Sequence, residues 1–438
     1  MKILYIAARD LLSPDSPRAA SIVMRINLLS KQHDVHVVFS QDEARAESEI
    51  RRAMPVIVSC TLLRTPAGSR LFERILYAFA KRLPFQVASC FDSGNIQVIS
   101  ALAANTKFDA IFYDTVRSLL VRQAMPVQRG RKDVLDADDL FSLRYSDLAR
   151  SSERSAFLGN FARRVPAALV PLARRLSFWI LRREARCMRQ LEMTMPGLFD
   201  HVVFVSDVEA QRLRDATGRK NITAIYQFIP GIIERSTAAP TGPGSNVDVY
   251  FLGNFLSPAN LASIKLIAGQ VWPLVRGQVP NARLHVVGGN MPAALRNRLE
   301  GEGILFAGYV ADLDSIIKDF GILLSPMGHG TGIKTKIVEA MWRGKAVVTN
   351  SAGIRGLRVV PGEHCLVSES PEDLARYTIS LLKDAGLRAE IGRSARECIV
   401  QSFEPHRLIR EWQSVIAPKT GAAKGNSGRY LTGSCQDW

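Results

Sequence analysis

The chain has 438 residues, of which 47% are hydrophobic and 22% charged, a balance typical of globular proteins rather than of disordered or fibrous ones. This length predicts two domains of roughly 200 residues each, and no apolar run approaches the ~18 residues that span a bilayer. The formal net charge of +16 predicts attraction to an anionic partner.

The first half alternates between strand-like and helix-like segments, which is the pattern of a doubly wound parallel sheet. MKILYIAARD is interpreted as a first buried strand rather than as a secretory signal, and SIVMRINLLSKQ as the helix after it. Further strands are predicted at VHVVFS, FDAIFYD, KDVLDAD, HVVFVS and ITAIYQF. The six cysteines are scattered, without zinc-site spacing, which predicts reduced thiols in a cytoplasmic protein.

The second half begins after STAAPTGPGSN, whose composition predicts a linker between domains. VDVYFLG, ARLHVVGG, ILFAG, GILLSP and AVVTN then repeat the strand rhythm. We therefore expect an α/β protein with two Rossmann-like domains facing each other across a cleft, at 1–235 and 247–395. A helix at 396–417 is expected to cross back to the first domain, and 418–438 to form a mobile tail.

A strongly basic stretch interrupts the first half. Between Arg144 and Arg189 there are eleven arginines, no lysine and three acidic residues, and we expect a helical insertion at about 144–190. Apolar residues recur there at helical spacing beside arginines: Leu169, Leu172, Ala173, Leu176, Trp179 and Ile180. Two interpretations stay open: the helix lies on an anionic membrane surface, or it packs on its own domain with a solvated arginine face.

The segment from Gly328 to Glu339 carries the clearest chemistry. A predicted strand, GILLSP, leads into a loop with three glycines and then into a predicted helix, KTKIVEAMWRG. Glycines let backbone amides approach a ligand closely, and a helix N-terminus attracts anions. The loop glycines are Gly328, Gly330 and Gly332, and Lys334 and Lys336 at the helix start would place cations beside a diphosphate.

Glu339 stands one turn along the same helix. A carboxylate at this position can accept hydrogen bonds from two vicinal ribose hydroxyls. Alternatively, Glu339 only complements the helix dipole. Together with the glycine loop and the two lysines, it favours a nucleotide diphosphate site.

The run GTGIKTKIVEAMWRGKAVVTNSAGIRGL resembles the donor-binding segment of the retaining GT-B glycosyltransferases called family 4 or group 1. FLGNFLSPAN, which contains Gly253, HVVGG and FAGYV resemble other parts of the same domain, so that the resemblance covers roughly residues 245 to 385. It implies transfer of a sugar, with retention, from a nucleotide-sugar co-substrate (EC 2.4) without a metal or other cofactor.

Two departures from this family pattern concern the donor. Thr331 stands where the family has a glutamate that contacts the donor sugar. The loop from Asn254 to Asn260 lacks the arginine and lysine that often neutralise the diphosphate, and Lys334 and Lys336 are expected to take over that work.

The first half resembles bacterial sugar transferases of exopolysaccharide and envelope loci through VLDADDLFSLRY, FDAIFYDTVRSLL and FDHVVFVSDVEAQRL. This resemblance implies a glycan or lipid-linked acceptor and work in the cytoplasm, at the inner face of the plasma membrane. Asp136, Asp138 and Asp139 follow a predicted strand; Asp138, or else Asp139, is the candidate that orients or deprotonates an acceptor hydroxyl. The alternative is that such aspartates only cap the next helix. Arg18 is expected to point into the cleft.

Three other interpretations of the sequence are less well supported. Asp136-Ala137-Asp138 spells the metal-binding motif of the GT-A fold, but the two predicted sheets disfavour that fold, and we expect no metal. A nucleic-acid-binding protein would suit the charge, yet the basic stretch has few aromatic residues suited to stacking, so no nucleic acid partner is expected. A nucleotide-sugar 2-epimerase has a similar fold and donor site, and only the products distinguish it from a transferase.

Overall fold

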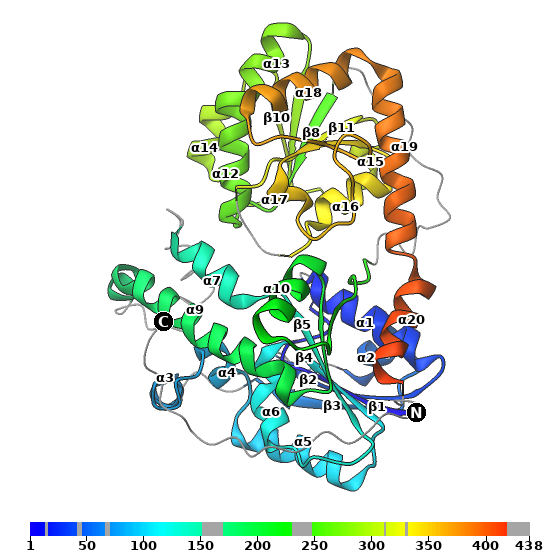
Figure 1. Cartoon of the computed structure of the whole chain (residues 1–438). Coiled ribbons are helices and arrows are strands. Elements are labelled where there is room, and N and C mark those ends of the chain that lie inside the picture. Colours follow the sequence, from blue (N-terminus) through cyan, green and yellow to red (C-terminus); the bar gives the residue numbers. More distant parts are fainter. Residues whose placement is uncertain are drawn as a thin grey trace.

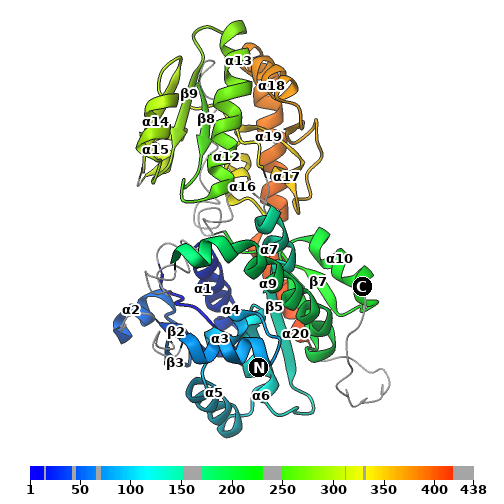
Figure 2. The ribbon, with the colours of Figure 1, turned by 90° about the vertical axis from the view of Figure 1, so that its left-hand side faces the viewer.

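The computed structural model describes residues 1–13, 16–41, 46–65, 71–150, 170–229, 248–310, 312–328 and 332–417. These residues form two lobes, each built on a parallel sheet flanked by helices (Figures 1 and 2). The predicted α/β class with two sheets is confirmed. The predicted linker and tail lie outside the described residues.

The N-terminal domain contains a seven-stranded sheet with the order β3-β2-β1-β4-β5-β6-β7. Its strands are β1 (Lys2–Ala7), β2 (Asp34–Gln41), β3 (Ser59–Arg64), β4 (Ala110–Asp114), β5 (Lys132–Asp138), β6 (His201–Phe204) and β7 (Ile222–Ala224). β3 was not predicted from the sequence, because SCTLLR begins with polar residues and only Leu63 in it is buried. ITAIYQF was overextended: only its first three residues pair, and the rest is buried outside the sheet.

Helices cover this sheet: α1 (Pro17–Ser30), α2 (Glu47–Ala53), α3 (Leu71–Ala80), α4 (Phe85–Cys90), α5 (Ser93–Asn105), α6 (Leu119–Ala124), α7 (Phe141–Arg150), α9 (Val170–Leu198) and α10 (Asp207–Thr217). α1 begins with Pro17, and the Ser16 side chain accepts the N–H of Ala19. Because β1 lies next to β4, the strand order reverses between them, and a crevice opens at the carboxyl ends of such strands.

α9 packs with a different face from the predicted one. Leu181, Ala185 and Met188 are buried, whereas the Trp179 side chain is 63% exposed and Ile180 is also exposed. The buried row contains Glu184 and Glu192, and these two carboxylates broke the apolar pattern in the sequence. They accept hydrogen bonds from the N–H groups of Phe85 and Ser142, which is why they are tolerated in the interior.

The C-terminal domain contains a six-stranded sheet with the order β10-β9-β8-β11-β12-β13. Its strands are β8 (Asp248–Leu252), β9 (Arg283–Val287), β10 (Ile304–Gly308), β11 (Ile322–Leu324), β12 (Ala346–Thr349) and β13 (Leu366–Val367). Its helices are α12 (Pro258–Leu266), α13 (Trp272–Gln278), α14 (Ala293–Leu299), α15 (Leu313–Ile317), α16 (Thr335–Trp342), α17 (Ser351–Ile354), α18 (Pro371–Lys383) and α19 (Ala385–Ser402), with a π-helical turn at Ile267–Val271. The two-residue β13 is too short to predict.

Gly288 lets two loops of this sheet meet. Its φ is +140°, and a Cβ atom there would lie 1.9 Å from the carbonyl oxygen of Gly253. The loops after β8 and β9 can approach this closely only if residue 288 has no side chain.

Replacing Gly288 with alanine is expected to lower the free energy of unfolding by about 1–3 kcal/mol, because it combines a strained φ with a backbone clash. Urea unfolding measures the change. Gly277→Ala in α13 is the matched control, since nothing lies within 4 Å of its Cβ position and it has no positive φ; it should be neutral or slightly stabilising. Equal losses in both variants would contradict the close approach.

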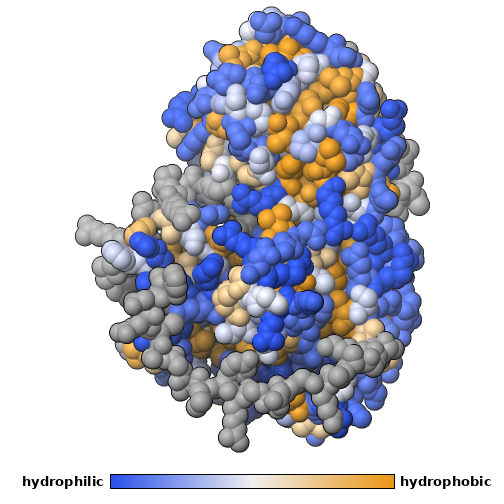
Figure 3. Space-filling view, viewed as in Figure 1, coloured by the Kyte–Doolittle hydropathy of each residue, from blue (hydrophilic) through white to orange (hydrophobic). Residues whose placement is uncertain are grey.

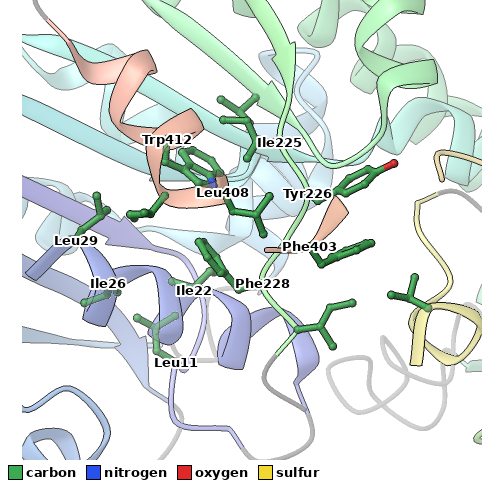
Figure 4. Packing of buried hydrophobic residues seen from close by; sticks show 14 of the residues in the cluster. Leu11, Ile22, Ile26, Leu29, Ile225, Tyr226, Phe228, Phe403, Leu408 and Trp412 are labelled. Carbon is green, nitrogen blue, oxygen red and sulfur yellow. The ribbon is translucent and has the colours of Figure 1, made fainter. Parts of the chain in front are cut away.

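The C-terminal helix α20 (Pro405–Ile416) leaves the C-terminal domain and packs on the N-terminal one. Trp412 contacts the Phe112 ring of β4 edge-on, with centroids 5.7 Å apart, and the Arg25 guanidinium lies 3.8 Å from the Trp412 ring centroid. Figure 4 shows Leu408 and Trp412 among buried residues of α1 and of the segment after β7. Leu408, Trp412 and Ile416 therefore belong to the hydrophobic core beside the first sheet.

Candidate functional site

A cavity of ≈ 770 Å³ opens at the carboxyl edge of the second sheet. The loops after β8, β9 and β10 and the start of α16 line it, which is where ligands bind in open α/β sheets. Among the predicted donor residues, the structure brings four together in this cavity: Gly253, Lys334, Lys336 and Glu339. On the face in Figure 3, hydrophilic residues predominate where the two domains meet.

The glycine loop approaches the N-terminal domain. His329, Gly330 and Thr331 lie outside the described residues, so the predicted roles of Gly330 and Thr331 stay predictions, as does that of Gly328. Gly332 has a φ of +70°, and a Cβ atom there would lie 2.6 Å from the Oδ1 atom of Asp139. The N–H of Gly332 donates to Oε1 of Glu209 at 3.3 Å. Gly332 therefore lies against the opposite domain, beside two carboxylates.

The two lysines at the start of α16 are half-buried. Burial, followed by repulsion from Arg355, lowers the pKa of Lys334 to about 8, and its Nζ donates to the carbonyl of Gly332 at 2.7 Å. Burial, followed by repulsion from Lys334, lowers the pKa of Lys336 to about 7. Nζ of Lys336 donates to Oδ1 of Asn260 at 2.9 Å and lies 4.4 Å from the Phe251 ring centroid. Both ammonium groups would gain from an anion in the cavity.

Glu339 lines the same cavity from α16, and its side chain is 30% exposed. Arg343, four residues later, lies 3.6 Å from its Oε2 atom and pairs with Asp314 at 2.7 Å through Nε. The carboxylate of Glu339 is thus held by its own helix while part of it faces the cavity, where it can accept hydrogen bonds.

Asp136 and Arg18 lie deeper than the sequence suggested. Asp136 is buried and paired with Arg18 and Arg25. Burial alone would raise the pKa of Asp136, but the two arginines outweigh it and lower the pKa to about 2. Arg18 is also buried, and it lies 3.6 Å from Asp114 and 3.2 Å from Asp138 instead of projecting into a cleft. Their positions favour a supporting role over contact with an acceptor.

Asp138 lies at the carboxyl end of β5 in a conformation rare for aspartate. Its φ is +69°, and the register between β5 and β6 shifts between Asp136 and Asp138. Thr115, at the end of neighbouring β4, has a φ of +58°. Such backbone strain costs roughly 1–3 kcal/mol per residue and clusters at functional sites, and bulges re-aim side chains. The Asp138 side chain is 18% exposed, unlike that of Asp136.

Asp139 pairs with Arg144 of α7 and faces Gly332. The neighbouring Glu209 is buried in the first turn of α10, where it also accepts the N–H of Leu140 at 3.0 Å. Burial raises the pKa of Glu209, while the N–H groups of Leu140 and Gly332 and the charge of Arg144 oppose that rise. Sequence reasoning missed Glu209 and Arg144, because a glutamate in a first helical turn is usually explained by the dipole.

In the described ranges, no group of three or more His, Cys, Asp or Glu side chains could hold a metal ion. The expectation of a reaction without metal stays a prediction. The ionisable side chains at the donor cavity and at the end of β5 that could act on a substrate include the carboxylates of Asp138, Asp139 and Glu339 and the two half-buried lysines.

Comparisons with known proteins agree with this geometry. Residues 246–384 match the family described as "Glycosyl transferases group 1". An uncharacterised 44.6 kDa protein from the cps region of Klebsiella pneumoniae is 24% identical over 173 residues, which is 37% of this chain and 44% of that protein. The match thus spans less than half of that relative's length.

The structural comparisons cover nearly the whole chain. A crystal structure of TarM aligns with a TM-score of 0.65 and 11% identity, over 95% of this chain and 99% of that one. The HepE protein of Anabaena, in complex with UDP, aligns with a TM-score of 0.56 and 16% identity, over 95% and 99% of the two chains. Both likenesses concern the fold. The C-terminal domain therefore matches the group 1 glycosyltransferase family, and the described residues have the two-sheet fold of the GT-B glycosyltransferase structures.

Proposed function

We propose that this protein is a glycosyltransferase that moves a sugar from a nucleotide-diphosphate sugar to a hydroxyl acceptor, with retention at the anomeric carbon. The cavity at residues 253–339 carries the proposal, since two half-buried lysines meet a helix N-terminus there and Glu339 follows one turn later. Cations and free N–H groups suit a diphosphate, and a carboxylate suits a ribose diol. In this arrangement Lys334 and Lys336 bind the diphosphate and Glu339 binds the ribose.

The acceptor is proposed to bind at the carboxyl end of β5, where Asp138 orients or deprotonates its hydroxyl. Strained backbone and partial exposure distinguish Asp138 from the buried Asp136. Gly332 lies against Asp139, so the donor loop and the end of β5 are neighbours across the two domains. This proximity is what transfer between a donor and an acceptor site requires.

A role in bacterial cell-surface or exopolysaccharide synthesis is the biological setting we propose, with a glycan or lipid-linked acceptor at the cytoplasmic face of the plasma membrane. The matched Klebsiella protein is encoded in a cps region, and another structure of similar fold is the lipopolysaccharide outer core galactosyltransferase WaaB. HepE is recorded with UDP and with UDP-glucose, which makes UDP-sugars the first donors to test.

The test is a donor screen. The protein is incubated with UDP-, GDP- and dTDP-sugars, and thermal stabilisation and slow hydrolysis of the donor are measured. A donor that binds at 100 times its Kd should stabilise the fold by about 2.7 kcal/mol. If none of these donors shifts the melting temperature, the proposal fails. An epimerised nucleotide sugar, instead of hydrolysis or transfer, would identify a nucleotide-sugar 2-epimerase.

Donor binding is expected to take up protons above neutral pH. In the free protein the pKa of Lys336 is about 7 and that of Lys334 about 8, and a neighbouring diphosphate raises both, because an opposite charge favours the ammonium form. Affinity should therefore be highest below about pH 7 and fall as pH rises through the free-state values. Calorimetry at pH 8 in two buffers of different ionisation enthalpy measures the uptake. A nucleotide sugar is used because its diphosphate does not titrate near neutrality.

Lys336→Met keeps the length of the side chain and removes its charge. We expect this variant to lose part of the proton uptake and to bind the donor about 10-fold more weakly at pH 7, in line with about 1.5–3 kcal/mol for a hydrogen bond to a charged group. Lys265→Met, in α12 of the same domain but outside the cavity lining, is the control and should leave both quantities unchanged. Undiminished uptake in Lys336→Met would refute the assignment.

A further inference from the structure

Helix α3 presents large apolar side chains to solvent. Leu76 is 53% exposed and Phe79 is 59% exposed, and Tyr77 beside them is also exposed. Among the side chains described in α3, from Glu73 to Ala80, only Ala78 is buried. Scattered exposed apolar residues are normal, but three within four residues of one helix form a patch that needs an explanation.

Helix α9 extends this patch. Trp179 and Ile180 are exposed on it, and Arg183 joins the two helices. The Arg183 guanidinium lies 4.1 Å from the Phe79 ring centroid, and its Nη2 donates to the carbonyl of Ala78 at 2.8 Å. We define the α3–α9 surface as the exposed residues of the two helices, the exposed Arg82 just after α3, and the half-buried Arg183 between them. Its members are Leu76, Tyr77, Phe79, Arg82, Trp179, Ile180, Arg182, Arg183, Arg186 and Arg189. Figure 2 shows α3 and α9 on the N-terminal domain, in the view turned by 90°.

The charged part of this surface is basic. Between Ser177 and Gln190 the sequence has four arginines and one acid, Glu184, which is buried and accepts the N–H of Phe85. Arg186 lines two hollows, one of ≈ 280 Å³ that it shares with Phe79 and Arg183, and one of ≈ 400 Å³ that it shares with Arg182 and Arg189. Each hollow thus combines guanidinium groups with an aromatic side chain, Phe79 in the first and Phe178 in the second.

We propose that the α3–α9 surface docks on a lipid bilayer that contains anionic lipids. The aromatic and aliphatic side chains enter the interface, and the arginines bind lipid phosphates, with the hollows beside Arg186 as headgroup sites. No helix in the described ranges is long and apolar enough to cross a membrane, so the contact is peripheral. Nucleic acid would satisfy the arginines but not Leu76 and Ile180, which need an apolar environment.

The location of the surface makes docking compatible with catalysis. α7 begins directly after the carboxylates at the end of β5 and packs along α9, where Ser142 donates to the buried Glu192. The donor cavity lies on the other domain. A bilayer under α3 and α9 would therefore lie on the acceptor side and leave the donor cavity open to solution. The inference itself does not depend on the proposed transfer reaction.

The test is co-sedimentation of the full chain with vesicles of phosphatidylcholine alone or mixed with phosphatidylglycerol. We expect binding to the mixed vesicles only, weakened by salt. The triple variant Arg182→Gln, Arg186→Gln and Arg189→Gln should lower the partition coefficient on the order of 100-fold. The control triple, Arg298→Gln, Arg393→Gln and Arg410→Gln, removes the same charge from exposed positions elsewhere and should bind as the unmodified protein does.

A second pair of variants tests the apolar part. Phe79→Ser with Trp179→Ser should lower the partition coefficient about 10-fold or more, whereas Val127→Ser with Leu274→Ser, at exposed apolar positions outside the surface, should not. Because all these side chains are exposed, thermal unfolding should change little in each variant. No binding to mixed vesicles, or equal loss in test and control variants, would overturn the proposal. If the protein binds duplex DNA and the double variant Phe79→Ser with Trp179→Ser still does so, the partner is nucleic acid and the proposal is wrong. If the protein is a dimer that this double variant converts to monomers, the partner is a second copy of the chain and the proposal is again wrong.

Discussion

Replacing Glu339 with glutamine is expected to lower kcat/KM for the nucleotide sugar by about 10- to 100-fold. The carboxylate can accept two charge-assisted hydrogen bonds from a ribose diol, each worth about 1.5–3 kcal/mol, and the amide retains one acceptor. The ribose does not change during transfer, so most of the loss should appear in KM rather than in kcat. Steady-state kinetics over a range of donor concentrations separates the two.

The matched control for Glu339→Gln is Glu300→Gln. Glu300 is also paired with an arginine one helical turn away, Arg296 at 3.2 Å, but it lies outside the donor cavity. Its neutralisation should leave the kinetics unchanged, because an exposed ion pair contributes only about 0–1 kcal/mol. Unaltered donor KM in Glu339→Gln would remove Glu339 from the ribose site and leave it as a partner of Arg343.

Replacing Asp136 with asparagine is expected to lower the free energy of unfolding by about 3–5 kcal/mol, the cost of removing one partner of a buried ion pair. Arg25 is fully buried and would lose its carboxylate, although Arg18 would keep Asp114 and Asp138. Urea unfolding at neutral pH measures the loss. The double variant Asp136→Asn with Arg25→Met removes both charges and should be more stable than the single variant.

The free energy of unfolding should depend on pH because the pKa of Asp136 is lowered in the folded state. Its folded value of about 2 lies below the usual 3.8, so the ionised carboxylate stabilises the folded state above about pH 4. That contribution is lost as pH falls from about 4 through 2, because the carboxylate becomes protonated in both states. The stability difference between the unmodified protein and Asp136→Asn should shrink in this window. A constant difference would indicate that packing, not charge, causes the loss.

Strands with continuous apolar runs were predictable, and so was the two-sheet architecture that follows from their alternation with helices. β1 and β8 illustrate this, since almost every residue in them is buried. β3 and β13 were not predictable, because one is half-polar and the other has two residues. The buried face of α9 was not predictable, because Glu184 and Glu192 lie in it with backbone partners from distant segments, and such partners leave no periodic signal.

The residues of the candidate site also include some that the sequence predicts and some that it does not. The donor residues were predictable because a glycine loop followed by a helix is a local sequence pattern. Their common cavity was predictable because neighbouring parallel strands end at one edge of the sheet. The sequence favoured Asp138 among the three aspartates but could not show their environments, because these depend on Arg18 and Arg25, more than a hundred residues earlier, and on a register shift. Glu209 contacts a residue 123 positions away. Sequence spacing cannot reveal such long-range pairs.

The position of α20 has a consequence for how the protein is made. Trp412, Leu408 and Phe403 pack into the core beside the first sheet, although they are synthesised about 180 residues or more after its last strand, β7. Domains generally fold as units during synthesis, with the N-terminal domain first. In this protein Phe112 and Arg25 would lack their contacts with Trp412 while the C-terminal domain is translated. Phe112 and Arg25 therefore gain their contacts with Trp412 only after the C-terminal domain has been translated.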